Sequence, residues 1–251
     1  MHKEQVINQM KEMRLSVMAE SFQQRISNND HHGLTVEQFV AMLVEDEYVA
    51  RKNRKLRRMI NAANFKPEQA CLENLDYSSA RNLQKAEVMR LAGSAWIENA
   101  QHVIITGPTG CGKTYLAESI GLQACKMGYP AKKIRYRILF EEIRAAKGVG
   151  TYLKYLKKLA RVKVLMLDDF LMQPIEQADA AFLMDVIEEK QQLGSIIVTT
   201  QYPVSKWHHQ LPDPTIADAI CDRLVHGAFT FNLKGDSMRK KTIKKSAQSD
   251  R

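Results

Sequence analysis

Gly107-Pro108-Thr109-Gly110-Cys111-Gly112-Lys113-Thr114 is the most informative stretch of this sequence. It matches the pattern G-x-x-x-x-G-K-[ST] at every fixed position. Glycines let the backbone curl so that its N–H groups face phosphate oxygens, and a helix that begins near Lys113 adds the positive end of its dipole. Lys113 can neutralise the β- and γ-phosphates of a nucleotide, and the Thr114 hydroxyl can bind Mg²⁺. The stretch predicts a nucleotide site made mainly by backbone amides, so Cys111 is expected to have no catalytic role. Tyr115, the residue after the loop, is included among the expected nucleotide-binding residues.

The segments on either side of this loop favour the same interpretation. The apolar run 102–106 has the composition of a buried strand, and residues 115–120 continue as a helix. Two further β-type runs, Val162 to Leu167 and Ser195 to Thr200, are separated from each other by helical patterns. Short buried strands that alternate with helices predict an α/β fold with a parallel sheet and crossover helices. The competing interpretation of the loop is a glycine-rich turn with an incidental lysine.

Two carboxylates follow the second of these runs, as Asp168 and Asp169. The carboxyl end of a strand is the edge at which an open α/β sheet binds its ligand. Asp168 is expected to hold Mg²⁺, directly or through water, and Asp169 is expected to orient and deprotonate the attacking water. The alternative is an ordinary strand end with two solvated acids. Thr200 and Gln201 end the third run, and either can hold the water or the γ-phosphate.

An arginine near the C-terminal end of the chain is a candidate for action between subunits. Arg223 follows a helical pattern at 216–221 and can reach the γ-phosphate of a neighbouring subunit. The competing role is an ion pair within the chain, with Asp218 or Asp222.

The first 66 or so residues have an all-helical pattern. Thr35 and Gln38 match a capping box, and the helix they open is expected to turn Phe39, Val40, Leu43 and Val44 inward. Lys66-Pro67 is a plausible domain boundary, because the residue before proline is disfavoured in a helix. A further helix is expected over 79–98, with Leu83, Val88, Leu91 and Trp96 as candidates for burial.

The charge of the chain is positive and clustered. Its 251 residues hold 37 Lys and Arg against 28 Asp and Glu, which gives a formal net charge of +9. Such a surplus favours a polyanionic partner, most simply nucleic acid. The candidate DNA contacts are the six cations of the 51–58 block and three on the 154–158 helix, namely Arg51, Lys52, Arg54, Lys55, Arg57, Arg58, Lys154, Lys157 and Lys158. The alternative is a solvated helix face.

Composition excludes several other classes of protein. A 45% hydrophobic and 26% charged chain can fold, and it has no apolar run near the roughly 18 residues that a membrane span needs. The N-terminus has no signal-peptide core, and the four cysteines form no C-x-x-C pair. We therefore expect a cytoplasmic protein without disulfides or a zinc cluster.

Five segments together resemble the AAA+ ATPases of the IstB-type family, the helper proteins of insertion-sequence transposition, which are similar to DnaC-type helicase loaders. The segments are GPTGCGKT (107–114), VLMLDDF (164–170), VTTQYPVSKW (198–207), DPTIADAICDRL (213–224) and LKGDSMRK (233–240). The resemblance covers most of residues 1–245. It implies a Mg²⁺-dependent ATPase that self-assembles on duplex DNA and assists the transposase of its element in target selection.

The same resemblance implies a domain organisation and the roles of individual residues. A helical DNA-binding and self-assembly domain would occupy residues 1–66, an AAA+ domain residues 67–245, and a mobile basic tail residues 246–251. No full C-terminal lid is expected. Lys113 and Thr114 correspond to the phosphate loop, Asp168 and Asp169 to the metal and base pair, and Arg223 to a finger that acts in trans. Arg239 matches an arginine that some loaders use near the nucleotide. The chain departs from the wider class in having Asp at 169 and Thr-Thr-Gln at 199–201.

Three other functions compete with this one. A helicase loader shares the fold and chemistry but has a replicative helicase as its partner. A small-molecule kinase would need an acceptor pocket, and the paired acids and basic N-terminal segment argue against it. A non-hydrolysing DNA-binding module would use the nucleotide only to hold subunits together.

Overall fold

The computed structural model describes residues 2–65 and 70–238. Backbone contacts divide the chain into two compact units, Met1–Arg58 and Met59–Arg251. Lys66-Pro67, Arg239 and the 246–251 tail lie outside the described residues. Across the described ranges, no helix is both long and apolar enough to cross a bilayer.

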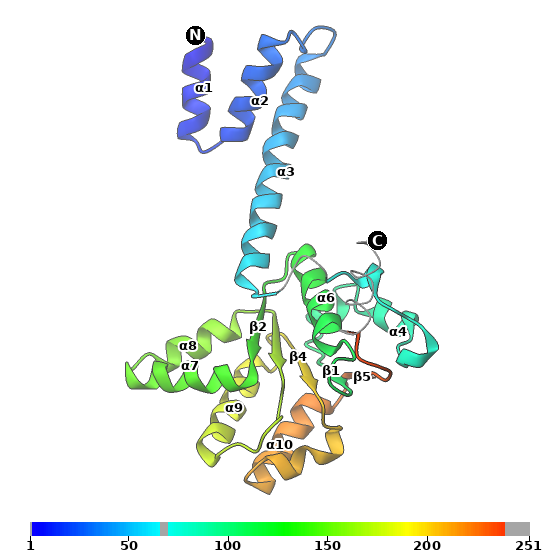
Figure 1. The fold of residues 1–251 in the computed structure, drawn as a ribbon. Helices are drawn as coiled ribbons and strands as arrows, with labels where there is room; N and C mark the ends of the chain where they lie inside the picture. The colour runs from blue at the N-terminus through cyan, green and yellow to red at the C-terminus, as the bar shows by residue number, and fades with distance from the viewer. Residues whose placement is uncertain (1, 66–69, 239–251) are drawn as a thin grey trace, which may run out of the picture. The chain divides into compact units, whose positions relative to one another are not determined.

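The first unit consists of helices (Figure 1). They are α1 (Lys3–Glu12), α2 (Ser16–Ser27) and α3 (Val36–Ala62), whose last turn lies beyond the unit boundary. The predicted capping box is confirmed: the Thr35 N–H donates to Gln38 Oε1 at 2.9 Å, and the Gln38 N–H donates to Thr35 Oγ1 at 3.2 Å. The backbone N–H groups of Thr35 and Gln38 at this helix start therefore both have partners within the same four-residue segment.

The inward face predicted for α3 is only half right. Leu43 is buried and Phe39 is half-buried, but Val40 and Val44 are 47% and 52% exposed. α2 contacts α3 along one face, where the Glu47 carboxylate accepts the N–H groups that start α2. Val40 and Val44 lie between the residues of α3 that contact α2, so they are exposed because they lie on another face of α3.

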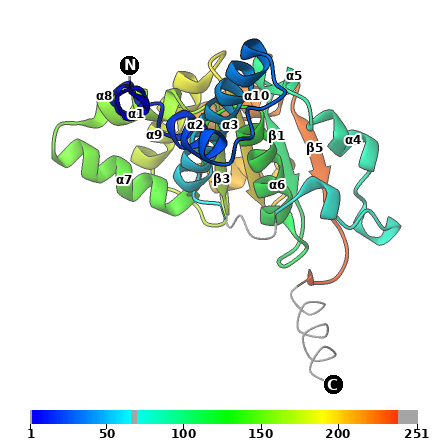
Figure 2. The same cartoon turned by 90° about the horizontal axis from the view of Figure 1, so that it is seen from above.

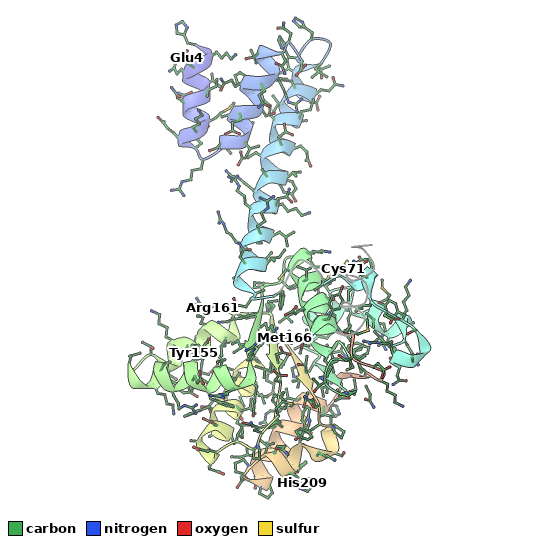
Figure 3. All side chains as sticks on the ribbon, in the orientation of Figure 1. Glu4, Cys71, Tyr155, Arg161, Met166 and His209 are labelled. Atoms are coloured by element: carbon green, nitrogen blue, oxygen red, sulfur yellow. The ribbon has the colours of Figure 1, made fainter. Side chains whose placement is uncertain are left out.

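The second unit is built on five parallel strands, which confirms the predicted fold class. They are β1 (Val103–Thr106), β2 (Ala131–Arg135), β3 (Val164–Asp168), β4 (Ser195–Thr200) and β5 (Phe229–Asn232). Their order across the sheet is β2-β3-β4-β1-β5, so β1 and β3 lie on either side of β4. Met166, halfway along β3, lies inside the unit and is fully buried (Figure 3). Because the strands are parallel, their carboxyl ends lie at one edge of the sheet, and the order places those of β3, β4 and β1 next to one another.

Helices cover both faces of this sheet. α6 (Lys113–Lys126) contacts β1 to β4 on one face. On the other face, alternate residues of β1, β3 and β4 join a buried cluster with α7 (Tyr136–Gly148), α8 (Tyr152–Ala160), α9 (Gln177–Lys190) and α10 (Pro214–Val225). Figure 2 shows α7, α8 and α9 as one group apart from α6. A short 3-10 helix, η3 (Val204–Gln210), leads from β4 to α10.

One expectation about elements is wrong, and one strand was not expected. The segment 79–98 is not one helix but three short pieces, η2 (Ser79–Arg81), α4 (Lys85–Arg90) and α5 (Ala95–Glu98), preceded by η1 (Leu72–Asn74). Its apolar residues are buried as predicted, but the chain breaks to pack them, with φ +52° at Asn82 and the Ala92 carbonyl accepting from Gln123 of α6. Strand β2 was not predicted, because its sequence AKKIR looks like part of a basic surface.

Candidate nucleotide site

The predicted phosphate loop connects the end of β1 to the start of α6. Gly107, Gly110 and Gly112 have φ values of +144°, +81° and +93°, which favour glycine over any other residue. A Cβ atom at Gly107 would collide with the carbonyl oxygen of Leu233, and one at Gly110 would collide with the Ser237 hydroxyl. The glycines are therefore required both by backbone conformation and by crowding. Pro108 and Thr109 are exposed on this loop, and Cys111 is fully buried.

Lys113 lies in the first turn of α6 and is only 8% exposed. Its ammonium group donates to the carbonyl oxygens of Gly107 and Pro108, at 2.8 and 2.9 Å. The lysine is thus folded over the loop that would surround a phosphate chain. Tyr115 follows in the same turn and is half-buried.

Asp168 is buried at the end of β3 and lies beside the loop. Its Oδ1 accepts hydrogen bonds from the hydroxyls of Thr114, at 2.9 Å, and Thr199, at 2.5 Å. A carboxylate and a hydroxyl oxygen are the kind of ligands that Mg²⁺ takes in nucleotide sites. The donor set therefore fits the ion that the motif implies, with Thr114 and Asp168 as its protein ligands.

Asp169 differs from its neighbour, because it is exposed and has a left-handed backbone with φ +60°. Its N–H donates to Thr199 Oγ1 at 3.3 Å, and the next N–H, that of Phe170, donates to the Thr199 carbonyl at 2.8 Å. β4 thus holds the turn that separates the buried acid from the exposed one.

Thr199 is a site residue that the sequence analysis missed. Of the two predicted candidates, Thr200 pairs with Thr106, the residue before the phosphate loop, and its hydroxyl accepts the Tyr202 N–H at 3.2 Å. Gln201 is exposed, and a role for either residue stays a prediction. The parallel register pairs Leu167 with Val198, so the next residues along, Asp168 and Thr199, are neighbours. Strand alternation could have pointed to Thr199 only if the order of the strands had been known.

Lys133 is the second residue that was missed. It lies on β2, and its ammonium forms ion pairs with Glu118 of α6 at 2.7 Å and with Asp168 Oδ2 at 3.2 Å. Burial alone would lower the pKa of Lys133, but the hydrogen bond and charge of Glu118, together with Asp168, raise it. A fixed positive charge therefore lies behind the carboxylate that would bind the metal.

Arg223 of α10 has a partner within the chain, although not one of the two expected acids. Its Nη2 pairs with Glu188 of α9 at 3.2 Å, and its Nη1 donates to the Ala219 carbonyl at 3.2 Å. The side chain is 27% exposed. Among the described residues, its partners lie on α9 and α10 and not on the phosphate loop.

The basic block at 51–58 is exposed along α3, but its members are not equivalent. Arg51 and Arg54 both pair with Glu47, at 2.8 and 3.1 Å. Burial alone would raise the pKa of Glu47, but hydrogen bonds from Arg51 and from the N–H groups of Met18 and Val17 lower it. Arg51 also donates to the Arg14 carbonyl, just before α2, at 2.7 Å, so both arginines are engaged within α3 and one of them links it to the start of α2.

The remaining predicted DNA contacts are exposed on two helices. Lys52, Lys55, Arg57 and Arg58 lie on α3. Lys154, Lys157 and Lys158 lie on α8, the helix on which Figure 3 labels Tyr155.

Comparison of the sequence with known proteins shows which family the chain resembles. The model of a family described as "IstB-like ATP binding protein" matches residues 8–246. An insertion sequence ATP-binding protein of Sinorhizobium fredii is 35% identical over 240 residues, which cover 96% of this chain and 98% of that protein. One from Pseudomonas fluorescens is 34% identical over 199 residues, covering 79% of this chain and 86% of that protein.

Solved structures show the same fold at lower identity. AMPPCP-bound DnaA from Aquifex aeolicus superposes with a TM-score of 0.59 and 19% identity, covering 74% of this chain; the chain spans 57% of that DnaA chain. The DnaC helicase loader superposes with a TM-score of 0.58 and 18% identity, covering 66% of this chain and 98% of the loader. The fold is therefore the AAA+ phosphate-loop fold of these proteins.

Proposed function

Since this chain belongs to the family of IstB-like ATP binding proteins, we propose that it is a Mg²⁺-dependent ATPase that assembles on duplex DNA and assists the transposase of an insertion sequence. The observation that carries the ATPase part is the contact between the two halves of the site. Thr114 of the phosphate loop donates to Asp168 at 2.9 Å, so the loop and the acidic strand end face the same space. An incidental glycine-rich turn has no reason to adjoin a buried carboxylate of this kind.

Each residue of the site has a distinct part in this reaction. Lys113 and the loop amides would bind the β- and γ-phosphates. Thr114 and Asp168 would hold Mg²⁺, which supplies charge neutralisation for the transferred phosphoryl group. Asp169 would accept a proton from the water whose oxygen attacks the γ-phosphorus, releasing ADP and phosphate. Asp169 is exposed, so its carboxylate is accessible to that water, whereas the carboxylate of Asp168 is buried.

Two substitutions test this assignment. Lys113→Ala should abolish ATP binding, because it removes the cation that neutralises the phosphates. Asp169→Asn should leave ATP binding within a few-fold of the parent and slow hydrolysis by about a hundredfold or more, the size of a typical general-base contribution. Binding is measured by calorimetry and hydrolysis by phosphate release, with and without Mg²⁺. Parent-like binding and hydrolysis in both variants would show that the site lies elsewhere.

The transposition part of the proposal comes from the relatives, which are named insertion sequence ATP-binding proteins. A helicase loader is the second candidate, because the DnaC loader shares this fold. At 18% identity that likeness concerns the fold alone, whereas the insertion-sequence relatives cover nearly the whole chain. A transposase gene directly upstream, and transposition that stops when this gene is deleted, would separate the two functions.

Self-assembly is supported by the apolar residues left exposed on α3. Val36, Val40, Val44 and Tyr48 are spaced four residues apart and are 83%, 47%, 52% and 59% exposed. Residues at this spacing lie on one helix face, and a stripe of this kind is a common feature of association surfaces. The stripe fits the assignment of residues 1–66 to self-assembly as well as to DNA binding.

The DNA part of the proposal rests on exposed cations of α3. Lys52, Lys55 and Arg58 are exposed, while Arg51 and Arg54 are held by Glu47. The triple variant K52E/K55E/R58E should therefore lose most affinity for random-sequence duplex without disturbing the first unit. Cations that neutralise phosphates release counterions, so the log–log salt slope should also flatten by about one unit for each phosphate that the variant leaves unneutralised.

A matched control carries the same change of charge at other exposed lysines, as K3E/K11E/K206E. It should bind duplex far better than the α3 variant in titrations at two salt concentrations. Equal affinity of the two variants would mean that the block is only a solvated helix face. A strong preference for one duplex sequence would show a base-reading element that the present assignment lacks.

A further inference from the structure

Arg81 is a buried arginine that lies against the phosphate loop from outside the motif. It ends η2 and is 7% exposed. Its Nη2 donates to the carbonyl oxygen of Cys111, the loop residue before Gly112. A Cβ atom at Gly112 would lie 2.9 Å from the same nitrogen. The guanidinium therefore touches the turn of the loop that leads into α6.

Two of the three guanidinium nitrogens have no partner in the part of the chain that the structure describes. Nε and Nη1 of Arg81 are buried and make no hydrogen bond within residues 2–65 and 70–238. None of the ion pairs within these ranges includes Arg81. Burying a charged group without a hydrogen-bonding counterion is costly, so such a group is expected to have a ligand.

The backbone around Arg81 is fixed in place by its neighbours in space. The Arg81 N–H donates to the Ser78 carbonyl at 2.9 Å, and the Arg81 carbonyl accepts the Lys234 N–H at 3.1 Å. The next side chain, Asn82, donates to the Asn232 carbonyl at 2.9 Å. Segments from both ends of the second unit thus hold the arginine where it is. The position of the arginine is therefore set by tertiary contacts of its own backbone and of Asn82.

We propose that Arg81 binds the nucleotide, with Nε and Nη1 donating to oxygens of its phosphate chain. The inference rests on the proposed nucleotide binding at the phosphate loop and adds to it a residue outside the motif. Nε and Nη1 lie on different edges of the guanidinium, so each would donate to its own phosphate oxygen in a charge-assisted hydrogen bond. The acceptors of a purine base are neutral and offer no counterion for a buried cation. Arg81 therefore increases the affinity for polyphosphates and does not select the base.

A purely structural role for Arg81 makes the opposite prediction about the ligand-free protein. If the arginine only packed the loop, its loss would destabilise the protein with or without nucleotide. If it waits for an anion, replacing it removes an uncompensated buried charge and leaves the free protein as stable as the parent or more so. Stability and affinity must therefore be measured on the same variants.

The test compares Arg81→Gln and Arg81→Lys with the parent, using ATP and the base-free probe tripolyphosphate. Arg81→Gln keeps a polar side chain at this position but loses the charge. It should weaken binding of both probes by the same factor, about ten- to hundredfold, without lowering the Tm of the ligand-free protein. Arg81→Lys, which keeps the charge but not the separate Nε and Nη1 donors, should bind both probes with affinities between those of the parent and of Arg81→Gln. Binding is measured by calorimetry and Tm by thermal unfolding.

Other outcomes overturn the inference. Weaker binding of ATP with unchanged binding of tripolyphosphate would place the contact at the base or the sugar. Unchanged affinity for both probes, or a lowered ligand-free Tm with affinity retained, would leave Arg81 a packing residue. If Arg81→Gln fails to fold, parent-like affinities in Arg81→Lys would overturn the inference, because a single ammonium group cannot replace two donors on different edges of the guanidinium. A parent that binds neither probe would instead overturn the proposed function.

Discussion

Thr199 connects the two acids of the site through one hydroxyl group. The hydroxyl donates to Asp168 and accepts the N–H of Asp169, so it orients the buried carboxylate and supports the turn that follows it. Thr200, the next residue, is equally buried, but its hydroxyl caps a turn at Tyr202. The two adjacent hydroxyls therefore have different partners: that of Thr199 binds the acidic turn after β3, and that of Thr200 binds the turn after β4.

This difference predicts unequal effects of Thr199→Val and Thr200→Val. Each removes one buried hydroxyl and should lower the free energy of unfolding by about 1–2 kcal/mol. Only Thr199→Val leaves Asp168 without one of its donors and the Asp169 turn without its acceptor, so only this variant should also slow ATP hydrolysis severalfold or more. The measurements are urea unfolding and phosphate release. Equal rates in the two variants would remove Thr199 from the site.

Two buried titratable side chains, those of His102 and Lys190, lie near the amino ends of the strands, opposite the edge that carries the nucleotide site. Just before β1, His102 is buried, and its Nδ1 accepts the Ile196 N–H at 3.1 Å. Burial, and the charge of Lys190, lower the pKa of His102 to about 4. Lys190 ends α9, is fully buried and donates to the Val162 carbonyl. Burial, together with the nearby Lys163, lowers the pKa of Lys190 to about 8.

The lowered pKa of Lys190 predicts how stability depends on pH. The folded pKa of about 8 lies below the ordinary value of 10.5, so between these values the unfolded chain binds more protons than the folded chain. The free energy of unfolding should therefore rise with pH across this window through this group, by about 2 kcal/mol between pH 7.5 and 9.5. Below pH 8 the folded protein carries the full cost of the buried charge.

Lys190→Met should abolish this rise. The comparison is made by urea unfolding at several pH values, with the exposed substitution Lys157→Met as the control. The pKa of His102, which Lys190 helps to lower, lies far below this pH window, so the difference between variants isolates Lys190. A Lys190→Met protein with the same pH slope as the parent would show that the lysine is neutral or solvated when folded.

For the whole molecule, the main question is whether the site is completed by a second subunit. Arg223 is paired with Glu188 and does not contact its own phosphate loop in the described part of the chain. A finger that acts in trans would exchange Glu188 for the γ-phosphate of a neighbour. ATP, but not ADP, offers that phosphate, so assembly is expected to depend on the triphosphate.

This exchange predicts opposite behaviour of the two partners in the pair. Arg223→Ala should lower ATP hydrolysis by a hundredfold or more and remove the ATP-dependent larger species in sedimentation, because the arginine itself is lost. Glu188→Ala removes only the competing carboxylate and should leave both properties at or above the level of the parent. The pair is half-exposed, so neither change should greatly alter the stability of the single chain. A protein that stays monomeric with ATP, or equal defects in the two variants, would contradict a role in trans.

Local sequence is sufficient for the features whose partners are close along the chain. The phosphate loop and the Thr35–Gln38 cap each complete their hydrogen bonds or backbone turns within a few residues, so their patterns are local. Asp168 was found because it directly follows four apolar strand residues. These local signals were enough for the α/β class and for most of the strands.

The distant residues that complete the site depend on tertiary structure. β2 is a basic segment by sequence, and only its pairing with β3 brings Lys133 to Asp168. Thr199 depends on the register of β4 against β3, and Arg81 depends on an approach between segments thirty residues apart. The helix predicted over 79–98 was wrong because packing overrides local propensity where the chain must break to bury its apolar residues. Each of these positions is stabilised by contacts with residues distant along the chain, either across the sheet or against the phosphate loop. A local sequence pattern does not encode such contacts.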